Sequence, residues 1–225
     1  MLKASLDWIK SNRSFLLVLL CFGLFRTAVA DWNPIPSGSM RPTLLEGDVV
    51  FVNRLAYDFK LPLSNLVLAH LGEPRRGDVV TFSSPQDGTR LIKRLVAVPG
   101  DRVEMRDEIL YINGQAAHYE HPEMLTEHLD SGQNLQALRL TERIDGVEHR
   151  VQWLKGVQAR SSFGPLTVPA GQYLMLGDNR DNSADSRYIG LVPRALLIGR
   201  AGRVLVSADI KAHWAPRFER FLQPI

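Results

Sequence analysis

The feature of this sequence that most constrains its fold is a short unit that recurs three times: a Gly-Asp pair followed by β-branched or aromatic residues. It occurs at residues 47–52, 77–82 and 100–103. Glycine and aspartate favour tight turns, and the residues after them favour extended backbone. Residues 91–98 and 172–176 have the same strand-forming composition. Several short strands separated by such turns predict a mainly β protein with antiparallel sheets.

The segment that follows the third unit is interpreted as an inserted β lobe. It begins with a hairpin pattern at residues 108–112, followed by Asn113-Gly114, a dipeptide typical of two-residue hairpin turns. Beyond this hairpin the segment is polar and weakly patterned as far as Phe163. A chain of 225 residues is long enough for one core with such a lobe. The predicted divisions are a first core segment at 32–102, the lobe at 103–169, and a second core segment, which includes the C-terminus, at 170–225.

An uncharged apolar run at residues 15–25 precedes the β region. One interpretation is a cleaved secretory signal peptide with a small-x-small site at residues 28–30. The other is an uncleaved transmembrane anchor at 14–31, in which Arg26 snorkels to the interface. By the positive-inside rule, both place residues 1–13 in the cytoplasm and the β region outside.

The cysteine count, the charge distribution and the absence of several motifs exclude some kinds of structure and function. The single cysteine, Cys21, rules out an intramolecular disulfide. The net charge of +3 is spread along the chain without a dense basic block, so no nucleic-acid partner is expected. The sequence has no G-x-S-x-G, H-E-x-x-H, P-loop or G-x-G-x-x-G motif.

The first candidate for chemistry is the loop at residues 36–43, in which Ser37 and Ser39 flank Gly38. Prolines on both sides restrict the backbone, and the glycine permits dihedral angles that other residues resist. Such a loop can hold one hydroxyl in a fixed position and aim N–H groups and a second hydroxyl at a developing oxyanion. The alternative is a polar turn after the apolar run.

The second candidate is Lys93, in the strand pattern at 91–98. Alternation along the strand puts its side chain on the same face as Leu91 and Leu95. An ammonium group among leucines is poorly solvated, which lowers its pKa from about 10.4 and makes the neutral amine available as a general base. The alternative is an edge-strand or snorkelling lysine.

The third candidate is the polar run at residues 177–187. A calcium-binding EF-hand loop is excluded because its sixth and twelfth positions here hold Ser186 and Val192. We interpret the run as a hydrogen-bonded loop that supports an active site, with Asp185 and Arg187 available as an ion pair.

Metal binding or catalysis by histidine has less support from the sequence. His118, His121 and His128 lie among glutamates and could bind a metal, but a solvated surface is the favoured interpretation. No histidine is near Ser39 in the sequence, which weakens a Ser-His-Asp triad. No metal and no cofactor are expected.

Together, these three segments resemble the motifs of bacterial type I signal peptidases, serine proteases that remove signal peptides from exported proteins. The match covers residues 35–48, 77–101 and 173–203, in the order found in that family. The resemblance implies a mainly β, antiparallel-sheet catalytic core with an inserted β lobe, preceded by one N-terminal transmembrane helix. It also implies a single-pass protein of the inner membrane, with its catalytic domain on the periplasmic side.

The resemblance implies specific catalytic roles. Ser39 attacks the scissile carbonyl and forms an acyl-enzyme, and neutral Lys93 is the general base. The Ser39 backbone N–H and the Ser37 hydroxyl form the oxyanion hole. Ser183 hydrogen-bonds Lys93 and orients it.

It implies supporting and binding roles as well. Asp185 and Arg187 stabilise the site. The partners are the lipid bilayer and the signal peptides of exported preproteins, cut after Ala-x-Ala sites. The shallow apolar subsites for the small side chains are lined by Ile35, Met40, Leu44 and Ile92.

Two other functions remain open from the sequence. One is a protease of the same class that is specialised for a single precursor. The other is a membrane-tethered β-domain that binds a partner or cation without catalysis, in which Ser39 and Lys93 can be replaced without loss of function.

Overall fold

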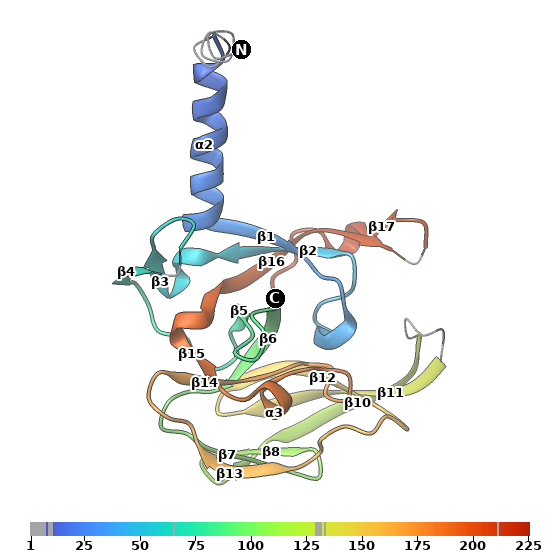
Figure 1. Cartoon of the computed structure of the whole chain (residues 1–225). Coiled ribbons are helices and arrows are strands. Elements are labelled where there is room, and N and C mark those ends of the chain that lie inside the picture. The colour runs from blue at the N-terminus through green and yellow to red at the C-terminus, as the bar shows by residue number, and fades with distance from the viewer. Residues whose placement is uncertain (1–7, 9–10, 65, 129–131, 133, 211) are drawn as a thin grey trace.

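The chain folds mainly into antiparallel β-sheets, as the sequence predicts (Figure 1). The computed structural model describes residues 8, 11–64, 66–128, 132, 134–210 and 212–225. Within these residues the α-helices are α2 (Arg13–Ala28) and α3 (Ser186–Ile189). Short 3₁₀ helices span Gly38–Met40, Arg54–Ala56, Arg194–Leu196 and Phe218–Arg220.

The largest sheet in the described part of the chain has eight strands, all paired antiparallel. Its order is β1-β2-β16-β5-β6-β14-β15, with β17 on β16. The strands predicted after the first two Gly-Asp pairs are β2 and β5, and the predictions at 91–98 and 172–176 correspond to β6 and β14. The bounds are β1 (Ala30–Pro34), β2 (Asp48–Asn53), β5 (Val79–Ser83), β6 (Arg90–Ala97), β14 (Gln172–Leu176), β15 (Val192–Pro193), β16 (Leu197–Asp209) and β17 (Ala215–Pro216).

The lobe contains two further sheets. One has the order β13-β7-β8-β9 and includes the predicted hairpin, whose turn residues Asn113 and Gly114 both have the positive φ that a two-residue turn requires. The other has the order β10-β11-β12. Their bounds are β7 (Arg102–Arg106), β8 (Ile109–Ile112), β9 (Gln115–Ala116), β10 (His118–His128), β11 (Asn134–Ile144), β12 (Val147–Leu154) and β13 (Phe163–Thr167). A separate hairpin joins β3 (Asp58–Lys60) and β4 (Val67–His70).

The strands β10 to β12 lie in the region whose sequence is polar and weakly patterned. Several of their buried positions hold polar side chains rather than apolar ones, among them Glu127, Glu142 and Gln152. An alternation of apolar and polar residues is therefore not visible in the sequence, although the strands are long and regular. Their buried polar groups are stabilised by partners from other segments, which a local pattern does not reveal.

The lobe and the large sheet share one hydrophobic cluster. It joins Val96 of β6 and Leu174 of β14 to Val103 of β7 and Leu110 of β8. A second cluster lies beneath the loop between β1 and β2 and includes Val50, Val79 and Val204 of the large sheet. These two clusters fix the lobe and the candidate loop on the same sheet.

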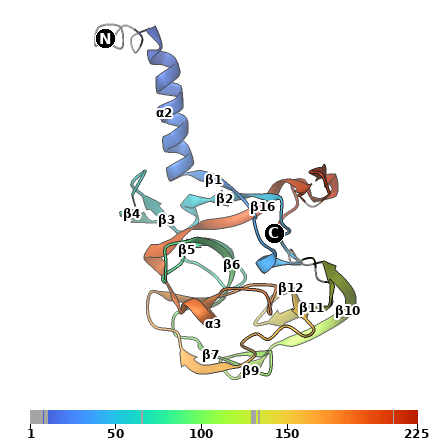
Figure 2. The ribbon, with the colours of Figure 1, turned by 45° about the vertical axis from the view of Figure 1, so that its right-hand side comes forward.

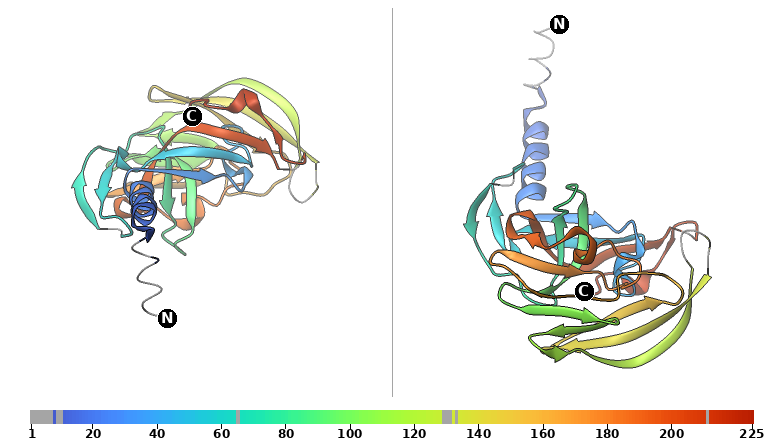
Figure 3. Two further views of the ribbon diagram at one scale, coloured as in Figure 1. Left: turned by 90° about the horizontal axis from the view of Figure 1, so that it is seen from above. Right: turned by 60° about the horizontal axis from the view of Figure 1, so that its bottom comes forward.

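Helix α2 projects away from the β-sheets, at the end of the molecule opposite the lobe (Figures 1 and 2). The same arrangement is visible when the molecule is turned about the horizontal axis (Figure 3). The helix has no buried residue, and its exposed side chains include Phe15, Val18 and Phe22. Within the described residues, no helix combines the length and hydrophobicity that a membrane crossing requires.

The N-terminal apolar segment differs in extent from the predicted anchor at 14–31. Its helix ends at Ala28, and β1 begins at Ala30. Ala30 pairs with Asn53 and Asp31 pairs with Val52, so the last residues assigned to the anchor belong to the large sheet. Backbone pairing with β2 ends the helix earlier than the apolar composition suggests.

Candidate active site

Ser39 lies in the 3₁₀ helix Gly38–Met40, on the loop between β1 and β2. The backbone of this loop is held by Asn179, from the third polar segment. Asn179 Nδ2 donates to Gly38 O at 2.9 Å, and the Asn179 N–H donates to Ser39 O at 3.1 Å. The position of the serine is thus set by a segment far away in the sequence.

Strand β6 brings Lys93 to this loop. Its side chain is buried, and its Nζ donates to Ser39 Oγ at 2.8 Å and to Ile92 O at 2.9 Å. The two candidate residues are 54 positions apart in the sequence. Their separation in space is within the hydrogen-bonding reach that a nucleophile and its general base require.

The environment of Lys93 favours its neutral form. Burial lowers the pKa of its ammonium group from 10.5 to about 8, although the carboxylates of Asp185 and Asp178 act in the opposite direction. The direction agrees with the prediction from the apolar strand. A lysine with this pKa is partly neutral at mildly alkaline pH, which allows it to accept a proton.

The predicted ion pair of the third segment is confirmed. Arg187 donates through Nε and Nη2 to the two oxygens of Asp185, at 2.9 and 2.8 Å, and both side chains are buried. Asp185 also accepts the backbone N–H of Gly177 at 3.0 Å. These contacts fold the polar segment back onto the end of β14.

Gly177 permits the polar segment 177–187 to pack closely against the Ser39 loop at this point. A Cβ atom there would lie 2.2 Å from Ser183 Oγ and 2.5 Å from Ser39 O. Both distances are far below ordinary van der Waals contact, and one involves the backbone of the candidate nucleophile. Glycine is therefore required by space rather than by dihedral angle.

Sequence analysis assigned no individual role to Arg94, Asp178 and Asn179, although all three lie within the matched segments. Arg94 donates through Nε and Nη2 to the two oxygens of Asp178, at 2.8 and 2.7 Å, and the Thr43 hydroxyl donates to the same carboxylate. This buried group links the residue after Lys93, the end of the Ser39 loop and the third segment. A signal was present, since Arg94 follows the candidate base directly and the two others lie in the polar run.

One contact implied by the resemblance is missing, and a second residue, Ser37, faces solvent. The hydrogen bond from Ser183 to Lys93 is not present: within the described chain, Ser183 Oγ is buried without a partner, while Lys93 Nζ bonds Ser39 and the Ile92 carbonyl. The Ser37 side chain is exposed at the start of the 3₁₀ helix.

The four apolar residues assigned to substrate subsites do gather in one cluster below the loop. Ile35, Met40 and Leu44 are 3%, 1% and 0% exposed, and they pack with the partly buried Ile92. The first three are therefore core residues that offer a substrate almost no surface. Of the four, Ile92 retains exposed area.

The described residues include no group of three or more His, Cys, Asp or Glu side chains arranged to hold a metal ion. His118, His121 and His128 are exposed along β10 in the lobe. Their surface position agrees with the interpretation favoured from the sequence.

Comparison with known proteins identifies a family and several relatives. Residues 5–206 match the family model described as signal peptidase, peptidase S26. Signal peptidase I of Pseudomonas fluorescens is 35% identical, over 94% of this chain and 78% of its own length, and that of Pseudomonas aeruginosa is 34% identical over the same shares. A crystal structure of a signal peptidase I from Enterococcus faecalis V583 is 34% identical, covering 57% of this chain and 96% of its own, with a TM-score of 0.34.

Proposed function

This chain belongs to the signal peptidase family, peptidase S26, and from that premise we propose that it removes signal peptides from exported preproteins with a Ser39–Lys93 dyad. Membership makes it a serine peptidase. One observation supports the dyad above all others: Lys93 Nζ lies 2.8 Å from Ser39 Oγ, and burial lowers the pKa of that lysine to about 8.

In the proposed mechanism, Ser39 Oγ attacks the scissile carbonyl carbon while neutral Lys93 accepts the hydroxyl proton. The resulting ammonium group gives this proton to the amine of the departing mature protein, which leaves an acyl-enzyme. Lys93, neutral again, takes a proton from water as the water oxygen attacks the acyl carbon. The ammonium group of Lys93 then gives this proton to Ser39 Oγ as the ester bond breaks, which releases the signal peptide and restores the neutral amine. Every proton transfer passes through Lys93 Nζ, which suits a base with a pKa near the working pH.

The proposed oxyanion hole consists of the Ser39 N–H and the Ser37 hydroxyl. The Ser39 N–H belongs to the same planar, trans peptide unit as Gly38 O, so the two point in opposite directions. Because Asn179 holds Gly38 O, it also fixes the direction of that N–H. The exposed Ser37 side chain is free to turn toward a bound carbonyl.

Ser183, Asp185 and Arg187 are proposed to support the dyad. The Asp185–Arg187 pair holds the third segment against the site. Ser183 Oγ is buried without a partner in the described part of the chain and lies close to the Ser39 backbone. We assign Ser183 Oγ the role of accepting an N–H of Lys93 during the reaction, which orients the amine and leaves its lone pair for the proton of Ser39.

Specificity for small-x-small sites is proposed to come from the shallow apolar surface around Ile92. Ile35, Met40 and Leu44 form the packed floor beneath it and leave little depth for a large side chain. A surface of this kind accepts alanine and gives larger residues no cavity to fill.

Attachment to the bilayer is proposed to occur through α2. A helix with apolar side chains exposed on all sides is unfavourable in water and favourable in lipid. Its sixteen residues span about 24 Å at 1.5 Å per residue. We assign the helix Arg13–Ala28 to the anchor, the residues before it to the cytoplasm and the sheets to the periplasmic side of the inner membrane. The catalytic core is assigned to residues 32–102 and 170–225, and the inserted lobe to 103–169.

Cleavage of a model preprotein with an Ala-x-Ala site is the experiment that tests this function. The detergent-solubilised protein is compared with Ser39→Ala and Lys93→Ala, and circular dichroism checks that each variant is folded. We expect wild type to cut after the second alanine and both variants to lose activity by at least about a thousandfold.

The possible outcomes separate the alternatives. Activity retained by either variant removes the dyad. Cleavage of only one member of a panel of unrelated preproteins indicates a protease specialised for a single precursor. Absence of cleavage of the whole panel by wild type favours a β-domain without catalysis.

A further inference from the structure

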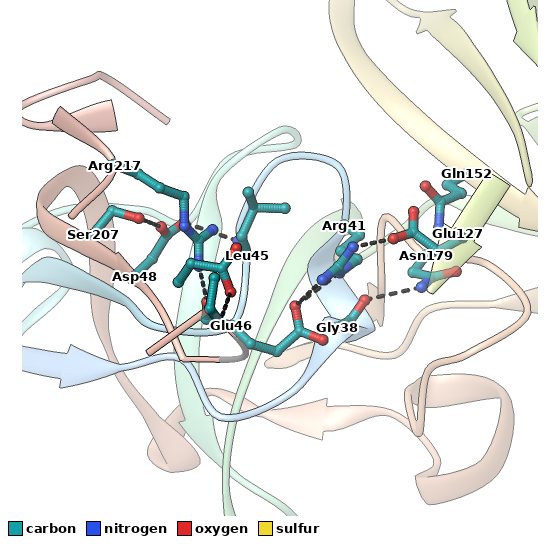
Figure 4. Close-up of polar contacts among 12 residues, drawn as sticks. Gly38, Arg41, Leu45, Glu46, Asp48, Glu127, Gln152, Asn179, Ser207 and Arg217 are labelled. Carbon is teal, nitrogen blue, oxygen red and sulfur yellow. Dashed lines mark hydrogen bonds and ion pairs between the residues drawn. The ribbon is translucent and has the colours of Figure 1, made fainter. Parts of the chain in front are cut away.

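The inserted lobe contacts the Ser39 loop through Arg41 (Figure 4). Arg41, two residues beyond Ser39, donates through Nε to Glu46 at 2.8 Å and through Nη1 to Glu127 of β10. Both glutamate side chains are buried, and Arg41 is half-buried. The guanidinium group therefore lies between one carboxylate of the core and one of the lobe.

The contact continues across the three-stranded sheet of the lobe, with one residue from each strand. Glu127 of β10 accepts from Arg139 Nη2 of β11 at 2.9 Å. Arg139 Nε donates to Gln152 Oε1 of β12 at 2.8 Å, and these two residues are direct partners in the sheet register. The buried side chain of Gln152 thus ends a polar path that begins at Arg41.

The backbone of Gln152 connects this path to the segment that holds the Ser39 loop. Its N–H donates to Asp178 O at 2.8 Å, and its carbonyl accepts the Arg180 N–H at 2.8 Å. Between these two residues lies Asn179, which holds Gly38 O and Ser39 O. The contacts form a closed ring that leaves the loop at residue 41 and rejoins it at residues 38 and 39.

Charges alternate along the first part of this ring: Arg41 pairs with Glu127, which pairs with Arg139, and Arg41 also pairs with Glu46, outside the ring. Arg41 and Glu127 each have a partner of opposite charge on both sides. If the charge of Arg41 or Glu127 is removed, each charged neighbour loses an ion-pair partner. Because these groups are buried, water replaces the lost partner poorly. A buried network of this kind gives the loop one preferred position.

We propose that Arg41 and Glu127 are positioning residues, and that the sheet β10–β12 holds the Ser39 loop in its reactive geometry through this ring. The inference rests on the proposed role of Ser39 as nucleophile. It gives the lobe a role in catalysis although the lobe contributes neither Ser39 nor Lys93. A displacement of about 1 Å at a reacting atom can lower a rate up to a hundredfold, so a small shift of the loop is enough to be measured.

The test compares Glu127→Gln with a matched control, Glu123→Gln. Both residues lie on β10 and pair with an arginine, but the Glu123–Arg150 pair is exposed and outside the ring. We expect Glu127→Gln to lower kcat by about tenfold to a hundredfold with KM changed less than about twofold. Glu123→Gln should match wild type in both constants.

A double variant separates positioning from general damage. If Arg41 and Glu127 act through each other, Arg41→Gln combined with Glu127→Gln should lose no more activity than the worse single variant. A product of the two single losses contradicts the inference, as does a wild-type kcat in Glu127→Gln.

Hydrogen–deuterium exchange gives a readout that does not depend on activity. Amides of residues 36–45 should exchange faster in Glu127→Gln than in wild type, while strands of the large sheet remain protected. Unchanged exchange in this segment overturns the inference even if wild type proves inactive. Failure of wild type to cleave, or cleavage by Ser39→Ala, instead overturns the proposed function and leaves the exchange result to decide the role of the ring.

Discussion

At the scale of single residues, Lys93 and Lys60 show that burial alone does not make a lysine a base. Both are buried, and burial lowers the pKa of each. Lys60 Nζ donates to the carbonyls of Ala195 and Leu197, which cannot give up a proton. Lys93 Nζ instead lies against the Ser39 hydroxyl, so its neutral form has a proton to accept.

The pH dependence of cleavage should follow the neutral fraction of Lys93. Because burial holds its pKa at about 8, kcat/KM should rise about tenfold per pH unit below pH 8 and level off above it. Initial rates between about pH 5.5 and 9.5 measure this profile. A flat profile between about pH 6 and 8 would rule out Lys93 as the base that limits acylation.

The free energy of unfolding should also depend on the protonation of Lys93. A pKa lowered from 10.5 to about 8 corresponds to a penalty of roughly 3 kcal/mol, at about 1.4 kcal/mol per unit. Below about pH 8 both states are protonated and the penalty is complete. Between about pH 8 and 10.5 the unfolded state binds more protons, so stability rises with pH.

Lys93→Met should therefore be inactive but more stable than wild type at pH 7, by about 1–3 kcal/mol, with a weaker rise above pH 8. Urea unfolding at pH 7 and at about pH 9.5 measures both effects. Lys60→Met is the matched control, since it removes a buried lysine that donates to two backbone carbonyls. This variant should retain activity. A destabilised Lys93→Met would show that the amine contributes more through its hydrogen bonds than it costs by burial.

At the scale of elements, the polar segment 177–187 connects the components of the site. It holds the Ser39 loop through Asn179, and it pairs with the residue after Lys93 through Asp178. The polar residues of this run identified it in the sequence, but they do not show which groups form hydrogen bonds with one another. Ser183 is an example, since its expected bond to Lys93 is not formed.

Gly177→Ala tests the close packing in this segment. The new Cβ would lie 2.5 Å from Ser39 O, so the backbone of the loop would have to move. We expect activity to fall by about a hundredfold or more, with a loss of stability of about 1–3 kcal/mol. Cleavage assays and thermal unfolding measure the two effects.

Gly202→Ala is the control for this variant, because a Cβ at Gly202 meets nothing within 4 Å. It should leave activity unchanged. If Gly177→Ala were as active as Gly202→Ala, the spacing between the third segment and Ser39 would not be critical for the reaction.

At the scale of the whole molecule, α2 and the lobe lie at opposite ends of the large sheet (Figure 3). The cluster around Val96 and Leu110 joins the lobe to this sheet. By contrast, α2 buries no residue against it. We therefore expect α2 to act as an independent membrane-binding element and the sheets to act as one unit.

Charges placed on α2 should release the protein from lipid. Val18→Glu with Phe22→Glu is expected to reduce binding to phospholipid vesicles by at least about a hundredfold, since a charge in the bilayer core costs about 2.5–3.5 kcal/mol. Vesicle flotation measures the bound fraction. Met124→Glu, an exposed position on the lobe, is the control and should float with the vesicles as wild type does. Equal flotation of all three proteins would contradict attachment through α2.

The sequence by itself determined the class of fold and the residues that could react. The Gly-Asp turns predicted β2 and β5, and composition placed β14 at its observed bounds, because turn and strand preferences are local. The serine loop, the lysine and the Asp185–Arg187 pair were candidates from local pattern, and the resemblance of three ordered segments to the motifs of one family singled them out.

Only the tertiary structure decided which of these groups meet. The contact between Lys93 and Ser39 depends on where β6 passes the loop, and Asn179 reaches Gly38 across 141 residues. Strands β10 to β12 of the lobe escaped prediction because their buried glutamates are stabilised by arginines on another strand or another segment. Hydrogen bonds between distant segments form within a few tenths of an ångström or not at all, and no local pattern encodes that spacing.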